Sequence, residues 1–397
     1  MPHQRAAGAP PVYLDYAATT PVRAEVREAI EPLLRQELTG NAASAHRFGR
    51  AARSLIEHAR RRVADALDAD PRHVVFTSGG TEADNMAIVG AALAARRAGR
   101  PVRVAVGSTE HKAVLAAAQA ITAFGGQMVA LPVDEAGRID LEAVERELAG
   151  GLAVLSVMWV NNETGTIQDI AAIAARATDA GVPFHTDAVQ AIGKVPCSFA
   201  NPNITMLAAS GHKIWAPQGT GVLLVRDRAA IDPLFHGGGQ QAGMRPGTEN
   251  VVGSVAMATA VELAVREVGA TAAATQSLRD DLERRLAERL PGLVVHSATT
   301  DRAPHISNVS VPGAESDALL LHLDLAGIAC SSGSACLTGT FVPSHVLSAM
   351  GVAPDVAGGS LRFSLSKASR PSDVDRVVTV LPDVAATVRE LGSRLAS

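Results

Sequence analysis

One lysine stands out among the residues whose type and position could do chemistry. Lys213 follows the apolar run 204–210 and precedes a glycine-rich turn. The chain has only four lysines, Lys112, Lys194, Lys213 and Lys367, and takes nearly all its positive charge from arginine. In such an arginine-rich background a lysine is better explained by its amine than by its charge. The amine becomes a nucleophile when its pKa is lowered. We therefore take Lys213 as a candidate nucleophile and base, and we expect Lys112 and Lys194 to be surface residues.

Further candidate groups follow the ends of predicted strands. From about residue 71 to 225, short apolar runs alternate with alanine-rich amphipathic segments, a pattern typical of a mostly parallel sheet covered by helices on both faces. Such sheets bind ligands outside the carboxyl ends of their strands. The residues expected there are Gly80 and Thr81 in a glycine turn, His111, Asn162, Asp187, Gln190, Ser210, His212 and Lys213.

Together these groups suit pyridoxal 5'-phosphate. The turn at Gly80 and Thr81 opens a helix and can present N–H groups to a phosphate, although an ordinary N-cap explains Ser78 or Thr81 equally well. Asp187 can hold a protonated ring nitrogen, His111 can cover a ring, and Lys213 can form an imine. For His185, which alternates with Asp187 along its strand, a satisfied core position is an equally open interpretation. A P-loop nucleotide site is excluded, because the chain has no GxxxxGK[ST] motif.

The composition is that of a globular enzyme. The 397 residues are 47% hydrophobic and 19% charged, enough for a substantial core, and the net charge of −4 gives no electrostatic reason to expect direct nucleic-acid binding. The N-terminal region has no apolar core of signal-peptide length, and no run reaches the roughly 18 to 20 apolar residues of a membrane span. We therefore expect a cytoplasmic protein without membrane association.

The three cysteines differ in their surroundings. They are too few and too unevenly spaced for a disulfide framework, and no paired CxxC spacing suggests a metal site. Cys330 has bulky apolar neighbours, whereas nothing near Cys197 suggests chemistry. Cys336 lies among small residues in the segment 331–340, which predicts an exposed loop. Cys336 is therefore the candidate reactive thiol.

The pattern after residue 247 predicts a second, smaller α+β domain. We expect one long helix over 248–269, a separate charged helix around 277–290, strands near 293–296 and 305–311, and a further helix, strand and closing helix. The predicted fold class is therefore α/β. A large domain over 20–265 carries the mostly parallel sheet between helices, and a small domain is formed by 1–19 and 266–397. The cysteine loop, at about 331–342, belongs to the small domain.

At this point the sequence resembles the cysteine desulfurases of the class V aminotransferase group, which are fold-type I pyridoxal-phosphate enzymes. The resemblance runs from YLDYAATTP (13–21) to LRFSLS (361–366), nearly the whole chain. The long segment after Cys336 is similar to that of the longer-loop, housekeeping and nitrogen-fixation members. The motifs that carry the resemblance follow the family's order: GNAASAHRFG, FTSGGTEADN, EHKAV, VNNETG, HTDAVQAIGK, SGHK, GGGQQAGMRPGTEN and SSGSAC.

The resemblance implies a role for each candidate residue. Lys213 would bind the cofactor covalently, Asp187 would pair with the ring nitrogen and His111 would stack on the ring, with His111 also counted among the catalytic residues. Arg362 would clamp the substrate carboxylate, as arginine's planar fork suits. The remaining implied contacts are Gly80, Thr81, Ser210 and His212 to the phosphate, Thr248 to the phosphate in the neighbouring subunit of a homodimer, Asn162 and Gln190 to the ring substituents, and Asn41 and Asn162 near the substrate.

The resemblance also implies a reaction and leaves alternatives open. L-Cysteine would give alanine and a persulfide on Cys336, which a protein sulfur acceptor would receive for iron–sulfur cluster assembly, tRNA thiolation, DNA phosphorothioation or another pathway. Selenocysteine lyase, cysteine-sulfinate lyase, another class V aminotransferase, and a non-catalytic docking scaffold remain alternatives, although a scaffold predicts loss of Lys213, Asp187 or Cys336. Four positions depart from the family pattern: Ala42, Ala216, Gln241 and Ser366.

Overall fold

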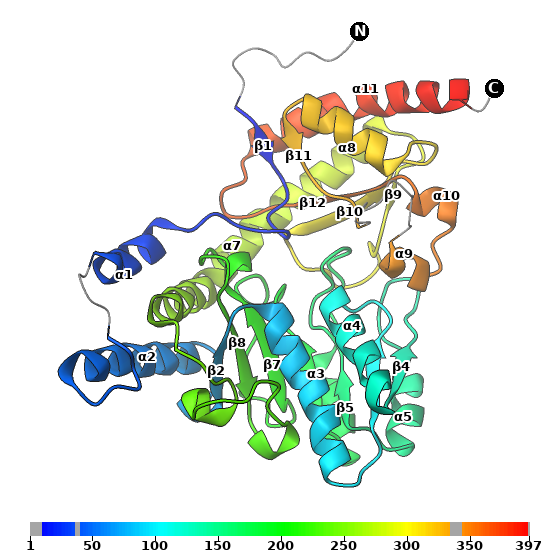
Figure 1. Ribbon diagram of the computed structural model, residues 1–397. Coiled ribbons are helices and arrows are strands. Elements are labelled where there is room, and N and C mark those ends of the chain that lie inside the picture. The colour runs from blue at the N-terminus through cyan, green and yellow to red at the C-terminus, as the bar shows by residue number, and fades with distance from the viewer. Residues whose placement is uncertain (1–9, 36–39, 334–343, 396–397) are drawn as a thin grey trace.

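The larger part of the protein is built on a seven-stranded sheet (Figure 1). The computed structural model describes residues 10–35, 40–333 and 344–395. The strand order is β2-β8-β7-β6-β5-β3-β4, in which β8 runs antiparallel to both neighbours and the other pairs are parallel. The strands are β2 (Val74–Thr77), β3 (Arg103–Gly107), β4 (Gln127–Leu131), β5 (Val154–Ser156), β6 (Phe184–Asp187), β7 (Met206–Ser210) and β8 (Gly221–Val225).

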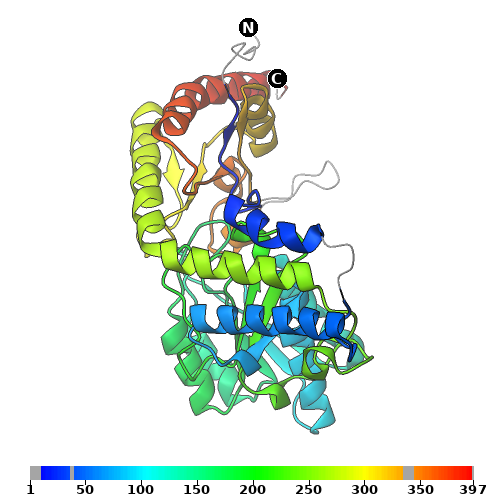
Figure 2. The ribbon, with the colours of Figure 1, turned by 90° about the vertical axis from the view of Figure 1, so that its left-hand side faces the viewer.

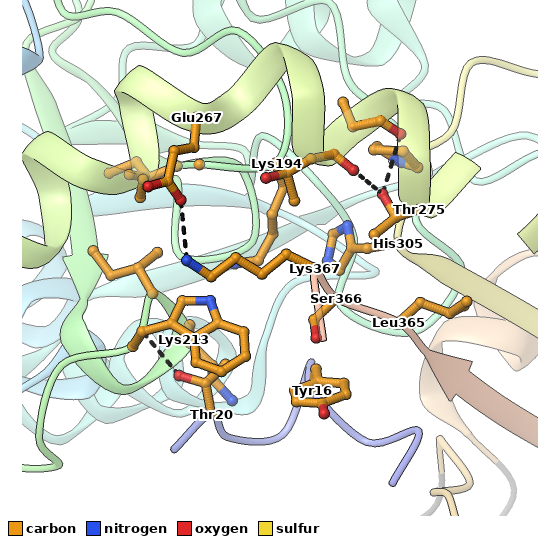
Figure 3. A pocket seen from close by; sticks show the side chains of 18 of the residues that line it. Tyr16, Thr20, Lys194, Lys213, Glu267, Thr275, His305, Leu365, Ser366 and Lys367 are labelled. Atoms are coloured by element: carbon orange, nitrogen blue, oxygen red, sulfur yellow. Dashed lines mark hydrogen bonds and ion pairs between the residues drawn. The ribbon is translucent and has the colours of Figure 1, made fainter. Parts of the chain in front are cut away.

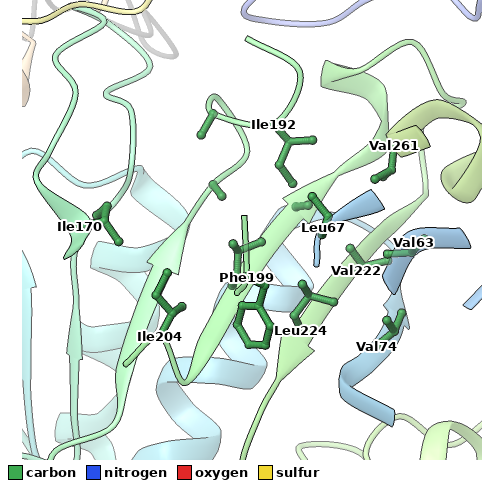
Figure 4. Packing of buried hydrophobic residues seen from close by; sticks show 14 of the residues in the cluster. Val63, Leu67, Val74, Ile170, Ile192, Phe199, Ile204, Val222, Leu224 and Val261 are labelled. Carbon is green, nitrogen blue, oxygen red and sulfur yellow. The ribbon is translucent and has the colours of Figure 1, made fainter. Parts of the chain in front are cut away.

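Helices cover both faces of this sheet because alternate strand residues point to opposite sides. Val75, Met206 and Leu223 pack toward α3 (Gly80–Arg97) and α4 (Lys112–Ala120). Val74 and Leu224 face the other way, into the core shown in Figure 4. The helices on that second side are α2 (Arg47–Ala66), α5 (Leu141–Ala149), α6 (Ile170–Asp179) and the first part of α7 (Val251–Arg289).

The smaller part has its own apolar core and two small sheets. Strands β12, β10 and β9 form an antiparallel sheet in that order, and β1 pairs with β11 in parallel. In Figure 1 these strands lie between the large sheet and the two helices α8 and α11. Their bounds are β1 (Val12–Tyr13), β9 (Val294–Val295), β10 (Ile306–Ser310), β11 (Ile328–Ala329), β12 (Ser360–Ser364), α8 (Ser316–Leu325) and α11 (Pro371–Leu395), with α1 (Ala24–Leu34), α9 (His345–Ala349) and α10 (Pro354–Ala357) elsewhere.

The helix α7 joins the two parts. Val261 belongs to the core of the large sheet, and Leu282 belongs to the core of the smaller part. Figure 2 shows the helix changing direction between these halves. The separate cores support the division predicted from the sequence, and we propose that the domain boundary near residue 265 lies inside α7.

Several sequence-based expectations for individual elements need correction. The two helices expected over 248–269 and 277–290 are one element, because the alanine-rich residues between them continue the hydrogen-bonded helix. The strand β4 was missed, since only one of its five residues is fully buried and its apolar pattern is weak.

Lys194 does not project from the surface. Its ammonium donates to the carbonyl of Val189, 3.2 Å away, and the residue lines a hollow beside Lys213. Within the described residues, no helix is long and apolar enough to cross a membrane.

Candidate active site

A cavity of about 540 Å³ opens at the carboxyl ends of the sheet strands. Its size is in the range of small-molecule sites. Backbone or side-chain atoms of the Ala17–Ala18 segment and of Asp84 also border it. The cavity brings together ten of the predicted site residues: Gly80, Thr81, His111, Asn162, Asp187, Gln190, Ser210, His212, Lys213 and Arg362.

The turn before α3 forms one end of the cavity. No side chain caps this helix, which leaves N–H groups at its first turn for an anion. Thr81 is therefore not the N-cap, a position that Gly79 takes. Glu82 accepts a hydrogen bond from the Ser78 N–H at 2.7 Å and fixes the shape of the turn. The backbone of β8 passes so close that a Cβ on Gly221 would lie 2.6 Å from Gly79 Cα.

Asp187 forms the floor of the cavity. It ends β6 with 5% of its surface exposed, and its Oδ1 accepts a hydrogen bond of 2.8 Å from the Val189 N–H. Burial raises the pKa of this carboxyl, while His111 and Lys213 oppose that rise. A cationic ring nitrogen above Asp187 would favour its ionised form further.

Gln190 is held by residues from distant parts of the chain. Its Nε2 donates to the Ala17 carbonyl at 2.9 Å, and its Oε1 lies 3.3 Å from His305 Nε2. The buried Nδ1 of His305 has no partner among the described residues. The Gln190 amide therefore has a fixed orientation at the edge of the cavity.

Lys213 lies in a short 3-10 turn, residues 211–213, directly after β7. Its Nζ donates to the carbonyl oxygens of Ala17 at 2.8 Å and Ala18 at 2.5 Å. Burial lowers the pKa of this amine to about 8, helped by Arg362 and opposed by Asp15 and Asp187. A substantial fraction of Lys213 is therefore neutral and nucleophilic just above neutral pH.

A second, smaller hollow of about 40 Å³ lies on the other side of Lys213 (Figure 3). Lys194, Lys213 and Lys367 all line it, so three of the four lysines in the chain gather here. Lys367 pairs with Glu267 at 3.0 Å. This hollow has room for little more than water, so of the two spaces beside Lys213 the larger cavity is the one that can take a cofactor.

Arg362, on β12, reaches into the large cavity from the smaller part of the protein. One terminal nitrogen donates to the Asn162 carbonyl at 2.9 Å and the other to Asp15 Oδ1 at 2.8 Å. Arg362 Nε and Asn162 Oδ1 are buried without a partner among the described residues. An unsatisfied donor and acceptor at one place suit a polar ligand such as an amino acid.

Cys336 falls outside the described residues. Two other predicted site residues lie outside this cavity. Asn41 is exposed and its Oδ1 accepts a hydrogen bond from the Ala43 N–H, so the structure does not bring it to the cavity. Thr248 is also exposed and lines a surface hollow with Phe235. These two remain predictions for a dimer or a substrate complex.

The other two cysteines are poor nucleophiles. Burial raises the pKa of both the Cys197 and the Cys330 thiols to about 12. A thiol with such a pKa is almost never a thiolate near neutral pH. The expectation that Cys336 is the reactive cysteine therefore has no competitor among the described cysteines.

The residues present fit pyridoxal 5'-phosphate. An uncapped helix start, a buried carboxylate, an aromatic ring at His111 and an amine of lowered pKa surround one cavity. Phosphate, ring nitrogen, ring face and aldehyde each have a chemically matched group.

Comparison with known proteins agrees with this chemistry. The family model described as "Aminotransferase class-V" matches residues 12–377. The chain belongs to the class V aminotransferase family. Enzymes of this family depend on pyridoxal 5'-phosphate, so the predictions of the cofactor and of the α/β, fold-type I architecture are confirmed.

Relatives of this class V enzyme carry a more specific name. It is 39% identical over 380 residues to "Cysteine desulfurase IscS" of Dictyoglomus turgidum, covering 96% of both chains. It is 40% identical over 383 residues to "Cysteine desulfurase NifS" of Azotobacter vinelandii, covering 96% of this chain and 94% of that one. A solved "NifS-like protein" superposes with a TM-score of 0.88 at 33% identity, over 95% of this chain and all of that one. The predicted resemblance to cysteine desulfurases is confirmed.

The structure also shows residues that the sequence reasoning missed. Asp84 and Glu110 are each 1% exposed and lie close enough to Asp187 to affect each other's charge. The sequence feature that could have identified Asp84 is a carboxylate on the buried side of the alanine-rich helix α3. Gln241, one of the departures from the family pattern, donates to Glu249 and accepts from the Phe76 N–H at 3.0 Å. A glutamate at 241 could not donate that first bond.

Proposed function

We propose that this protein removes the sulfur of L-cysteine, forms alanine, and passes the sulfur as a Cys336 persulfide to a protein acceptor. The observation that carries the proposal is the single cavity bordered by Lys213, Asp187 and Arg362. The family membership and the names of the relatives support the reaction class. Cys336, in SSGSAC, supplies the thiol that transamination does not need.

Bound pyridoxal phosphate would withdraw electrons from the substrate α-carbon. Each residue then has a separate task. The turn at Gly80 and Thr81, with Ser210 and His212, holds the phosphate, and Asp187 holds the proton on the ring nitrogen. Arg362 orients the substrate by its carboxylate, and the Lys213 amine accepts and returns a proton at the α-carbon.

The described ends of the segment that carries Cys336 lie next to this cavity. The Ser344 hydroxyl donates to the buried Glu163 carboxylate, and a Cβ on Gly333 would overlap the same carboxylate oxygen. Ser331 exchanges both backbone hydrogen bonds with Arg362, at 3.1 and 2.6 Å. These contacts support a role for the Cys336 thiolate as the group that attacks the substrate sulfur.

We further propose a cytoplasmic homodimer with shared active sites. The exposed segment around Thr248 is tied to the cofactor turn of its own chain, because Arg245 donates to Glu82 at 2.8 Å. The resemblance to the cysteine desulfurases implies that Thr248 reaches the phosphate site of the second subunit.

The test is incubation of the purified holoenzyme with L-cysteine and a thiol reductant. We expect equal amounts of alanine and sulfide from the wild type, and loss of both in Cys336→Ala. Cys197→Ala is the matched control and should keep both products, because its thiol has a strongly raised pKa. Alanine formation that survives in Cys336→Ala would contradict the role of that thiol. Turnover of selenocysteine or cysteine sulfinate alone would replace the proposed substrate.

A further inference from the structure

Three buried carboxyl side chains lie near one another beside the active-site cavity. Asp187 ends β6, Asp84 comes from α3, and Glu110 follows β3. Their exposed fractions are 5%, 1% and 1%. Three ionised carboxylates in so little water would repel one another, and each would cost several kcal/mol of lost hydration. At least one of them must therefore hold a proton.

Asp187 has the surroundings that favour ionisation. Burial raises its pKa, but His111, Lys213 and Lys194 each oppose that rise, and the Val189 N–H donates to its Oδ1. It also borders the cavity, where a ring nitrogen would add a further positive charge. The pKa of Asp84 is instead raised by burial first and then by the neighbouring carboxyl groups of Asp187 and Glu110.

Asp84 instead faces a histidine. Its Oδ1 lies 3.6 Å from His185 Nε2, and neither atom has another partner among the described residues. His185 is completely buried, and its Nδ1 lies 2.9 Å from Ser156 Oγ on the adjacent strand. Because strand residues alternate, His185 and Asp187 point to the same face of β6. His185 is therefore satisfied at Nδ1, whereas its Nε2 lies opposite Asp84 without a hydrogen-bond partner among the described residues.

Three proton arrangements could join these atoms: a charged pair, an ionised carboxylate that accepts from the Nε2–H of a neutral imidazole, or a neutral carboxylic acid that donates to a neutral imidazole. Burial lowers the pKa of His185 to about 3, which disfavours the charged pair, and raises the pKa of Asp84, which disfavours the ionised carboxylate, so the neutral acid is the favoured arrangement. In it, His185 carries its one proton on Nδ1, donates to Ser156 Oγ, and leaves Nε2 free to accept. Asp84 supplies the missing donor.

We propose that Asp84 is a positioning residue of the cofactor site: it stays protonated, donates to His185 Nε2, and leaves Asp187 as the carboxylate that ionises beneath the ring. The inference rests on the proposed role of Asp187 toward the cofactor.

Glu110 is the remaining neighbour. Its Oε1 accepts a 2.6 Å hydrogen bond from the Met158 N–H, its Oε2 is unpaired, and burial raises its pKa as well. Any test must therefore separate Asp84 from Glu110.

The first measurement is the infrared spectrum of the holoenzyme near neutral pH. We expect the carbonyl stretch of a buried, protonated carboxylic acid, part of which disappears in Asp84→Asn. The matched variant Glu110→Gln must leave that part in place, and His185→Phe must move its frequency, because the hydrogen-bond acceptor is lost. A spectrum in which Asp84→Asn removes no such band would overturn the proposal.

The second measurement is the pH midpoint of the absorbance change of the bound cofactor. Asp84→Asn replaces a neutral acid by a neutral amide of the same shape, so the midpoint should stay at the wild-type value. Asp187→Asn should shift it by about 1–3 units, the effect of removing a nearby opposite charge. A shift of about one unit or more in Asp84→Asn would mean that Asp84 is ionised.

His185→Phe adds a test that a merely structural role cannot pass. In His185→Phe the Asp84 carboxylic acid loses its hydrogen-bond acceptor and should donate to the Asp187 carboxylate instead. The pH midpoint of the cofactor absorbance change should therefore move in the same direction as in Asp187→Asn. Replacing Asp84 by leucine in the same protein removes the donor and should restore the wild-type midpoint. Failure of this restoration contradicts the proposal.

None of these measurements requires turnover of L-cysteine. A wild-type protein with normal titrations and no alanine formation would refute the proposed function and leave the assignment of Asp84 intact. An unaltered midpoint in Asp187→Asn would refute the role of Asp187, and with it the inference.

Discussion

Replacing Arg362 by lysine tests how the site holds its substrate. Arg362 is 7% exposed, and the two terminal nitrogens of its guanidinium already bond the Asn162 carbonyl and Asp15. Lysine keeps the charge but loses the planar fork and the unpaired Nε. A hydrogen bond to a charged group contributes about 1.5–3 kcal/mol, so kcat/KM for L-cysteine should fall by about 10- to 100-fold.

Most of this loss should appear as a higher KM. The substrate carboxylate takes no part in breaking the carbon–sulfur bond, so its contact with Arg362 is the same before and during the reaction. The assay is alanine formation across a range of L-cysteine concentrations, with cofactor absorbance measured to show that the site is intact. Arg279→Lys is the control, because Arg279 is also buried and bonds the Ala303 carbonyl, yet lies outside the cavity. A normal KM with a lowered kcat in Arg362→Lys, or an equal rise of KM in Arg279→Lys, would refute the reasoning.

Other perturbations test the remaining parts of the site. Capture of added pyridoxal phosphate by the cofactor-free protein should quicken as the pH rises through about 8, since the pKa of Lys213 is lowered to about 8 and only its neutral form attacks; a rate that is flat between pH 7 and 9 would contradict this. Gly221→Ala should lose bound cofactor, measured by absorbance, because its Cβ would lie 2.6 Å from the backbone of the phosphate-binding turn. Gly269→Ala, in open space on α7, should keep the cofactor and raise the free energy of unfolding in urea by about 0.5–1 kcal/mol; equal cofactor loss in both variants would remove the steric argument. Gly333→Ala should slow alanine formation without changing cofactor absorbance, because its side chain would displace the Glu163 carboxylate; unchanged turnover would show that this contact does not matter.

The strand ends are the part of the site that the sequence predicts well. The apolar runs around β6, β7 and β8 are buried throughout, so their lengths and ends are visible in composition. Asp187 and Lys213 must lie at one edge of the sheet, because they end or follow β6 and β7, which are parallel neighbours. The strand β4 shows the limit of this reasoning, since a half-exposed run carries little apolar signal.

Lys194 shows a second limit. Its position after a turn predicted exposure, but the direction of its side chain depends on the packing of α7 and the smaller part of the protein. The hollow it lines also includes Ala264 and Leu365, which are far away in the sequence. Local pattern carries no information about such a contact.

The charge state of the site is a third property that lies outside the reach of sequence motifs. HTDAVQ and TEADN each contain a carboxyl group, and nothing in either motif says that Asp84 and Asp187 share one buried region. Only the folded sheet places α3 over β6 and brings His185 within 3.6 Å of Asp84. Since like charges so close cannot both remain ionised without compensation, the fold decides which carboxyl keeps its proton. A motif can therefore identify Asp187 as the residue that contacts the ring, but the packing of the fold determines which neighbouring residue allows its carboxylate to stay ionised.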